Sequence, residues 1–252
     1  MELPNEPKAF VKRHNKSVYD CGDFVAKEFA EDKPASDVFN EALNDARANE
    51  AGLPAPAVLE VSCPDGRWTI FTERFPGHSL RTQLKEGADP KEVLTKLVKL
   101  QLKVQSASAP LLNRQKDKLA RMIDSVKELD PSTRYELQVR LDGLRNAENV
   151  CHGDVNPSNV IEDEEGNLYL VDWAHATRGN AACDVAMTYM LLTMRDGKEV
   201  ADLYLDLYSK AADMPKQEVM NCLPIVAAAE LARDREDDKD FLMSWIDVAD
   251  YQ

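Results

Sequence analysis

Three oxygen-bearing side chains lie close together in the second half of the chain. Asp154 and Asn159 flank a proline-containing turn, and Asp172 follows at the end of an apolar, β-rich run. Transfer of a γ-phosphoryl group needs a carboxylate that orients the attacking hydroxyl and accepts its proton, and hard oxygen ligands that hold Mg²⁺ against the nucleotide phosphates. Asp154 suits the first role, and Asn159 and Asp172 suit the second. The residue types therefore point to phosphoryl transfer.

The residues around Asp154, Asn159 and Asp172 show how strongly these three side chains indicate catalysis. Asp, Asn and Pro are ordinary turn formers, so the triplet His152-Gly153-Asp154 alone is weak support for catalysis. The continuation is more specific. Val160-Ile161 predicts a short strand, residues 162–167 an acidic turn, and residues 168–171 a returning strand. Both strand ends then deliver polar side chains to one place.

This segment resembles the signature of the aminoglycoside phosphotransferase and choline kinase-like family, which is related to the protein kinases. The family has His-Gly-Asp, then Asn after four variable residues, and a metal-binding strand that ends Asp-Trp, as Asp172-Trp173 does here. The resemblance continues to Asp184-Val185-Ala186 at the start of the next helix. It implies that Asp154 is catalytic, that Asn159 and Asp172 bind the metal, and that His152 and Asp184 support the loop.

The N-terminal third predicts a nucleotide-binding lysine. Residues 17–29 read as two strands joined at Gly22-Asp23, and Lys27 lies on the second of them. Kinases place such a lysine on the α- and β-phosphates, and an acidic residue on the following helix holds it. Glu41, within the helical pattern of residues 37–49, is the expected partner. The alternative is a solvated lysine and an exposed helical acid, but their order matches the family pattern.

Residues 68–80 resemble the strand and linker that join the two lobes in this family. The resemblance implies that the nucleotide base bonds to main-chain groups around Thr72, Glu73 and Phe75. His78 is interpreted as a surface loop residue rather than a functional one. Ser17 is the expected side-chain donor to phosphate.

Two departures from the family pattern concern the nucleotide and hydroxyl sides. Residues 12–19 contain no glycine, so no glycine-rich loop covers the phosphates. Asn15, Lys16 and Ser17 offer donors instead, and the alternative is an impaired nucleotide site. Asn156 stands where many family members carry histidine, which leaves the geometry of the hydroxyl-side pocket open.

Helical periodicity dominates the remainder of the chain. Helices are predicted at 90–105, 113–129, 132–144, 187–194, 199–212, 216–232 and 238–249. In the family the acceptor pocket is built from C-terminal helices and the insertion before the catalytic loop. Glu230 and Asp234, one helical turn apart, are the candidate anchors for an amine or hydroxyl of the acceptor.

The amino-acid composition limits the kinds of molecule that the protein is expected to bind. A formal net charge of −14 and a pI near 4.8 argue against binding to nucleic acid or to an anionic membrane, because both need a basic face. The five cysteines form no Cys-x-x-Cys pair, so they fit neither a disulfide framework nor a zinc site. No signal peptide or membrane span is apparent, and a reducing cytoplasm is the expected location.

These observations predict an α+β, two-lobed protein kinase-like fold. A β-rich lobe, residues 1–75, should precede a mainly helical lobe, residues 76–252, with a helical insertion at about 80–148. The expected function is transfer of the γ-phosphate of ATP, or of GTP, with Mg²⁺, to a hydroxyl of a small molecule. The alternative is a catalytically weak nucleotide- or ligand-binding module on the same fold. A protein kinase is disfavoured because Asp-Phe-Gly and Ala-Pro-Glu are absent. The oligomeric state and the acceptor stay open.

Overall fold

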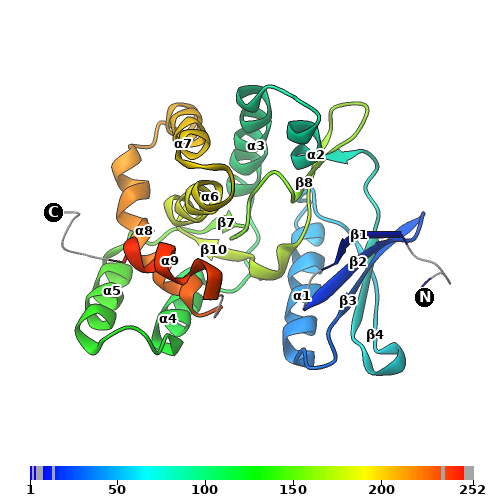
Figure 1. Cartoon of the computed structure of the whole chain (residues 1–252), viewed down its shortest axis with the longest axis horizontal. Coiled ribbons are helices and arrows are strands. Elements are labelled where there is room, and N and C mark those ends of the chain that lie inside the picture. Colours follow the sequence, from blue (N-terminus) through cyan, green and yellow to red (C-terminus); the bar gives the residue numbers. More distant parts are fainter. Residues whose placement is uncertain (2, 4–7, 13–14, 234–235, 247–252) are drawn as a thin grey trace. The chain divides into compact units, whose positions relative to one another are not determined.

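A computed structural model describes residues 1, 3, 8–12, 15–233 and 236–246 of the chain. The chain divides into two compact units, residues 1–80 with 158–175 and residues 81–157 with 176–252. An antiparallel sheet forms in the N-terminal region and helices dominate the C-terminal part (Figure 1). The predicted α+β fold class is therefore confirmed. The division at residue 75 stays a prediction about the lobes.

The first unit is built on a five-stranded sheet with the order β1-β2-β3-β5-β4. Every neighbouring pair is antiparallel. The predicted strand pair appears as β2 and β3, and the β-rich run before the linker appears as β5. The bounds are β1 (Lys8–Lys12), β2 (Lys16–Asp20), β3 (Phe24–Phe29), β4 (Val58–Ser62) and β5 (Thr69–Glu73).

Helix α1 (Ala35–Glu50) packs against this sheet through an apolar cluster. Phe29 of β3 and Ile70 of β5 meet Val38 and Ala42 of α1, and all four are buried. Val38 and Ala42 are four residues apart and share one helix face. Glu41 and Asp45, three and seven residues after Val38, lie on the same buried face of α1.

A smaller antiparallel sheet completes the first unit, with the order β6-β8-β9. Its strands are β6 (His78–Ser79), β8 (Val160–Glu162) and β9 (Leu168–Leu170), so the predicted hairpin at 160–171 is present. Gly77 makes the approach of β6 possible. Its φ is +96°, and a Cβ there would lie 2.0 Å from the carbonyl oxygen of Glu162.

The second unit is mainly helical. The predicted helices are present, although the one expected at 113–129 ends early because Val126 is extended. The helices are α2 (Leu80–Lys85, which begins at the last residue of the first unit), α3 (Pro90–Gln105), α4 (Gln115–Ser125), α5 (Pro131–Gly143), α6 (Ala181–Asp196), α7 (Lys198–Ala212), α8 (Lys216–Leu231) and α9 (Lys239–Ser244). The helix predicted at 238–249 ends early, at Ser244, where Trp245 is the C-cap, and residues 247–249 lie outside the described residues.

Helix α6 forms the centre of the second unit, where its first three turns are almost wholly buried. A ribbon of β7 (Asn149–Cys151) and β10 (Thr177–Gly179) precedes it, and Cys151 is buried as predicted. The short 3₁₀ turns are η1 (Pro64–Gly66), η2 (Trp173–His175) and η3 (Glu236–Asp238).

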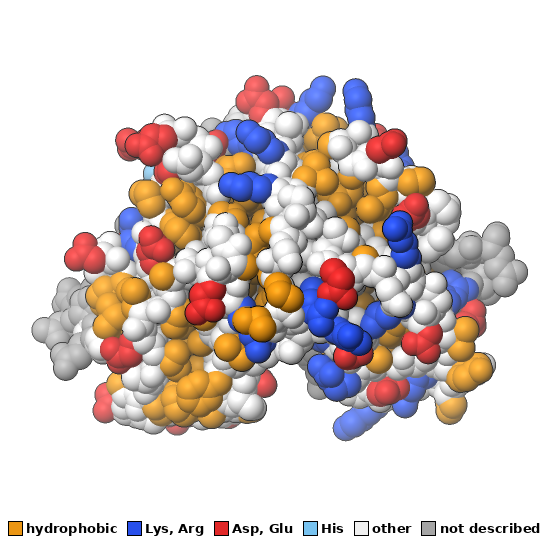
Figure 2. Space-filling model, turned by 180° about the vertical axis from the view of Figure 1, so that it is seen from behind, with side chains coloured by type: hydrophobic (Ala, Val, Ile, Leu, Met, Phe, Trp, Pro, Cys, Tyr) orange, Lys and Arg blue, Asp and Glu red, His pale blue; other side chains and the backbone are white. Residues whose placement is uncertain are grey.

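Surface and hydropathy features agree with the composition. The face in Figure 2 carries acidic and basic side chains interspersed with apolar ones, so the acidic excess is not gathered into one uniform patch there. Among the described residues, no helix combines the length and the apolar character needed to cross a bilayer.

Candidate active site

Strand register brings Lys27 to Glu41. Side chains alternate between the faces of a strand, so Lys27 shares a face with Phe29, which packs on α1. Glu41 lies one position before the buried Ala42 on that helix, and the Lys27 ammonium donates to its carboxylate. The side chains of Lys27 and Glu41 are only 12% and 9% exposed. The structure therefore brings the predicted lysine and acid together.

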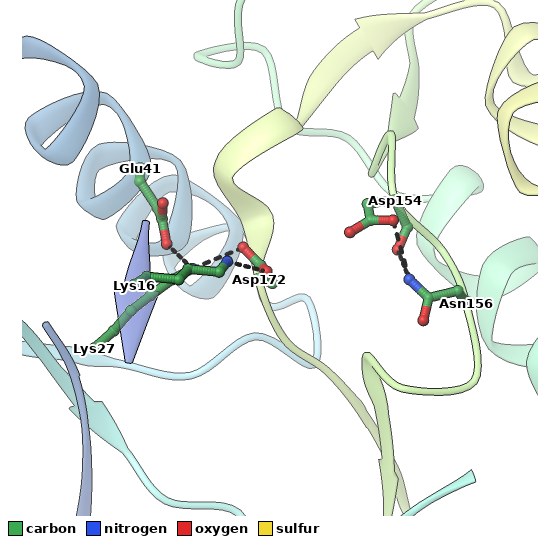
Figure 3. Close-up of polar contacts among 6 residues, drawn as sticks. All are labelled: Lys16, Lys27, Glu41, Asp154, Asn156 and Asp172. Carbon is green, nitrogen blue, oxygen red and sulfur yellow. Dashed lines mark hydrogen bonds and ion pairs between the residues drawn. The ribbon is translucent and has the colours of Figure 1, made fainter. Parts of the chain in front are cut away.

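Asp172 accepts from two lysines in the same unit. Lys27 Nζ lies 2.8 Å from Oδ1 of Asp172, and Lys16 Nζ lies 3.0 Å from Oδ2 (Figure 3). Lys16 pairs with Phe29 across the β2–β3 ladder, and Lys27 pairs with Val18. Both lysines therefore project from one face of the sheet as diagonal neighbours. The result is a cluster of two ammonium groups and two carboxylates: Lys16, Lys27, Glu41 and Asp172.

The charges in this cluster shift one another's pKa. Burial alone lowers the pKa of Lys27, but attraction to Asp172 and Glu41 outweighs burial and raises it. Burial alone raises the pKa of Asp172, but Lys27 and Lys16 outweigh it and hold that pKa well below its usual range. Burial and repulsion from Lys27 lower the pKa of Lys16 in spite of its contact with Asp172. Asp172 is therefore a carboxylate, able to bind a cation at neutral pH.

The backbone at Asp172 is strained and firmly anchored. Its φ is +69°, in the left-handed region that aspartate tolerates better than most residues. The buried Trp173 follows, and its Nε1 donates to the carbonyl of Leu170 at 2.7 Å. Asn44 of α1 donates to the carbonyl of Ala174 at 3.3 Å. These contacts fix the turn that presents the Asp172 carboxylate.

Asn159 and Asp172 emerge from the same end of the β8–β9 hairpin. The N–H of Val171 donates to the carbonyl of Asn159 at 2.9 Å, which extends the ladder by one pair. One carboxylate and one amide oxygen are hard ligands of the kind Mg²⁺ takes, with water and phosphate completing the shell. Among the described residues, no group of three or more His, Cys, Asp or Glu side chains is arranged to hold a metal. The donor set thus suits Mg²⁺ bound jointly with phosphates.

In the second unit, the loop after β7 fixes the carboxylate of Asp154. Asn156, which is 2% exposed, donates from Nδ2 to Oδ1 of Asp154 and to its carbonyl, both at 3.0 Å (Figure 3). The N–H of Asp154 donates to Nδ1 of His152 at 3.2 Å, so the proton of that imidazole lies on Nε2. Asn156 is a positioning residue that the sequence raised only as a departure from the family pattern.

Asp184 anchors this loop through its backbone, as the resemblance implied. Its Oδ1 accepts from the N–H of Gly153 at 2.7 Å, where Gly153 has a φ of +78°. Its Oδ2 accepts from the side-chain amides of Gln101 and Gln105 of α3, at 3.0 and 2.9 Å. Asp184 is 2% exposed, so all these bonds are dry.

Two tyrosines of α7 complete this network. Tyr204 donates its hydroxyl to Oε1 of Gln101 at 2.6 Å, and Tyr208 donates to Oε1 of Gln105. A hydroxyl that donates to the amide oxygen leaves the amide nitrogen to face the carboxylate, so each tyrosine selects one amide orientation. We name these five side chains, Gln101, Gln105, Asp184, Tyr204 and Tyr208, the Asp184 network. The sequence analysis missed this network. The feature that could have indicated it is that the two glutamines and the two tyrosines each stand four residues apart.

The predicted nucleotide-binding positions lie along β2, β5 and the linker. Thr72 and Glu73 end β5, and Glu73 exchanges contacts with the backbone of Ala57. The ring of Phe75 stacks on Tyr169 with centroids 4.1 Å apart. Ser17 alternates with Lys16 and therefore faces away from the lysines. The roles of these residues stay predictions.

The proposed acceptor anchors and His78 have distinct environments. Glu230 of α8 is 2% exposed and lies 3.0 Å from the guanidinium of Arg233, so it forms an internal ion pair. Asp234 lies outside the described residues. His78 is exposed, as expected, but it belongs to β6 rather than to a loop.

Comparisons with known proteins show which family the chain belongs to. A model of the phosphotransferase enzyme family matches residues 13–218, most of the chain. The chain belongs to this family. The predicted enzyme class, a phosphotransferase, is thereby confirmed. A comparison with curated protein sequences finds no match to this chain.

Solved structures share the fold of the phosphotransferase at low sequence identity. A thermostable mutant of aminoglycoside phosphotransferase APH(4)-Ia, in ternary complex with AMP-PNP and hygromycin B, is 14% identical with a TM-score of 0.68, covering 96% of this chain and 92% of that one. An aminoglycoside-3'-phosphotransferase of type VIII is 19% identical, with a TM-score of 0.64 and coverage of 90% and 93%. Choline kinase LicA from Streptococcus pneumoniae is 14% identical, with a TM-score of 0.57 and coverage of 93% and 90%. These likenesses confirm the kinase-like fold.

Proposed function

We propose that this phosphotransferase transfers the γ-phosphate of ATP to a hydroxyl group of a small molecule. The family match and the paired site residues support the proposal. Relatives in the fold act on an aminoglycoside or on choline and are seen with AMP-PNP or ADP, which favours an adenine nucleotide and a small hydroxylated acceptor. GTP has no support from these comparisons. We infer a cytoplasmic location from the free cysteines alone.

The first unit supplies the nucleotide and metal side of the reaction. Lys27 contacts the phosphates, and Glu41 holds its ammonium in place. Asp172 and Asn159 would hold Mg²⁺, which would neutralise charge on the phosphates. Main-chain groups around Thr72, Glu73 and Phe75 receive the base. Ser17 remains the proposed side-chain donor to phosphate, although its side chain lies on the opposite face of β2 from Lys16. The partly buried ion pairs of Lys27 with Glu41 and Asp172 are the single observation that carries this assignment.

The second unit supplies the hydroxyl side. Asp154 orients the acceptor hydroxyl and accepts its proton as the oxygen attacks the γ-phosphorus, while the bond to the β-phosphate oxygen breaks and ADP leaves. Asn156 keeps the carboxylate of Asp154 in one orientation, and Asp184 with His152 holds the loop. Glu230 and Asp234 remain the proposed acceptor anchors. The internal pair of Glu230 with Arg233 means that Glu230 acts only where an acceptor amine replaces that guanidinium.

The decisive experiment separates turnover from binding. Asp154→Ala should fold normally and bind ATP with Mg²⁺, but lose at least about a thousandfold in kcat because the positioned base is removed. The measurements are calorimetry with ATP and a coupled ADP-release assay against a panel of aminoglycosides, amino alcohols and sugars. Asp32→Ala, which removes an exposed carboxylate, is the control.

The outcomes distinguish the enzyme from a binding module. Full activity in Asp154→Ala would overturn the catalytic assignment. ATP binding by the wild type with no turnover on any acceptor class would favour the alternative of a catalytically weak nucleotide-binding module, which the family match does not support.

A further inference from the structure

Lys16, the first residue of β2, is largely shielded from solvent and pairs with a carboxylate. Its side chain is 17% exposed, and its ammonium lies 3.0 Å from Oδ2 of Asp172. The ladder register places it beside Lys27 on one face of the sheet. Both oxygens of the proposed metal ligand are therefore in contact with an ammonium group, one from each lysine.

The two lysines are not equivalent. Lys27 contacts two carboxylates, Glu41 and Asp172, whereas Lys16 contacts only Asp172 among the ion pairs of the described residues. The charge of Lys16 is thus the less compensated of the two. A triphosphate carries more negative charge than one carboxylate, so at the same distance it would attract Lys16 more strongly than Asp172 does.

The segment around Lys16, residues 12–19, lacks the residues that usually bind phosphate through backbone N–H groups. Residues 12–19 contain no glycine, so no backbone cradle of the glycine-rich kind approaches the phosphates. A long side chain with a terminal ammonium can reach where a backbone amide cannot, and it binds phosphate as a point charge. Among the described residues of this segment, Lys16 is the half-buried cation, whereas Lys12 is exposed.

We propose that Lys16 is a second phosphate-binding lysine, which exchanges its ion pair with Asp172 for the phosphates of a bound nucleoside triphosphate. This assignment rests on the proposed function. In the exchange, one oxygen of Asp172 loses its ammonium partner and becomes accessible to a cation. Lys16 thereby does with a side chain what glycine-rich loops do with backbone N–H groups.

The test compares ligands with and without phosphates. Lys16→Met keeps the length and apolar stem of the side chain but removes its charge. Its affinity for ATP in the presence of Mg²⁺, measured by calorimetry, should fall about tenfold, equivalent to about 1.4 kcal/mol. Its affinity for adenosine should stay unchanged, because adenosine has no phosphate. Lys16→Arg should keep ATP binding within about threefold, since a guanidinium also binds phosphate.

A matched control removes the same charge elsewhere in the unit. Lys33 is partly exposed and pairs with Asp37 on the helix surface, so Lys33→Met should leave both affinities unchanged. If Lys16 only neutralises Asp172, Lys16→Met will bind ATP as tightly as the wild type or more tightly, and this overturns the proposal. An equal loss of affinity for adenosine and ATP also overturns it, because that result indicates a distorted site.

Failure of this assignment differs from failure of the proposed function. ATP binding by the wild type that Lys16→Met leaves unchanged overturns only the role of Lys16. Absence of ATP binding by the wild type overturns the proposed function and the role of Lys16 together.

Discussion

Asp172 and Asp184 are carboxylates in different units of the molecule, and they are stabilised in different ways. Two ammonium groups contact Asp172, whereas neutral amides and a backbone N–H contact Asp184. The side chain of Asp172 is 24% exposed, while Asp184 is 2% exposed as a whole residue. Charged partners near solvent can be exchanged for a metal or a phosphate. Dry neutral donors cannot be replaced without leaving polar groups unsatisfied.

This difference separates two tasks of a phosphotransferase site. Under the proposed function, the charges around Asp172 rearrange when a highly charged nucleotide binds, and ion pairs near solvent are suited to such an exchange. The loop before Asp154 must keep one geometry throughout the reaction, so the Asp184 network is suited to rigidity. Substitutions near Asp172 should therefore affect binding, and substitutions near Asp184 should affect stability.

The largest expected effect is that of Asp184→Ala. This change leaves the N–H of Gly153 and the amides of Gln101 and Gln105 buried without their acceptor, at a cost of about 3 kcal/mol. The Tm should fall by about 10 °C in thermal denaturation.

Asp172→Ala should lower Tm by no more than about 3 °C, because Lys27 keeps its ion pair with Glu41. The same change should abolish Mg²⁺-dependent ATP binding in calorimetry. A larger loss of Tm in Asp172→Ala than in Asp184→Ala would break the comparison.

The next effect concerns Asp45, which adds a third carboxylate near the lysines. Asp45 of α1 is 4% exposed, and burial with repulsion from Glu41 raises its pKa to about 8. The unfolded pKa is about 3.9, so the folded state binds the extra proton between these values and stability falls as pH rises through this window. Asp45→Asn removes that loss, so its Tm should exceed that of the wild type by several degrees at pH 8 and by little at pH 4.

Differential scanning calorimetry across this pH range measures the difference. Asp37→Asn, at an exposed position in the first turn of the same helix, is the control and should show no such dependence. A stability difference between Asp45→Asn and the wild type that is independent of pH would show that the lysines keep Asp45 ionised.

The smallest effects are those of the tyrosine hydroxyls. Tyr204→Phe and Tyr208→Phe each remove one buried hydrogen bond to a glutamine amide, at a cost of about 1 kcal/mol, or about 2–4 °C in Tm. Tyr135→Phe, at a position 73% exposed, should change nothing. Since both glutamines bond to Oδ2 of Asp184, the double variant should lose more than the sum of the single losses in urea denaturation. Strict additivity would mean that the two tyrosines act independently.

Much of the secondary structure followed from local pattern. The strand pair around Gly22-Asp23 and the helix at 90–105 were predicted because alternation and helical periodicity are properties of adjacent residues. The end of α4 was missed because Val126 turns extended before the periodic apolar residues run out. The partners of Lys27 were only half predicted: Glu41 was expected, but Asp172 was not, since no local pattern reports a partner from a distant strand.

Local sequence alone indicated the chemistry: a carboxylate, an amide and an aspartate that is the proposed metal ligand stand at short fixed spacings, and a lysine and an acid stand in the order expected for phosphoryl transfer. Short spacings survive folding because the chain itself holds the groups near one another. Folding alone brings Lys16 and Lys27 together on Asp172 and places two tyrosines on the glutamines that hold Asp184. These contacts depend on strand register and helix packing, which join residues far apart in the chain.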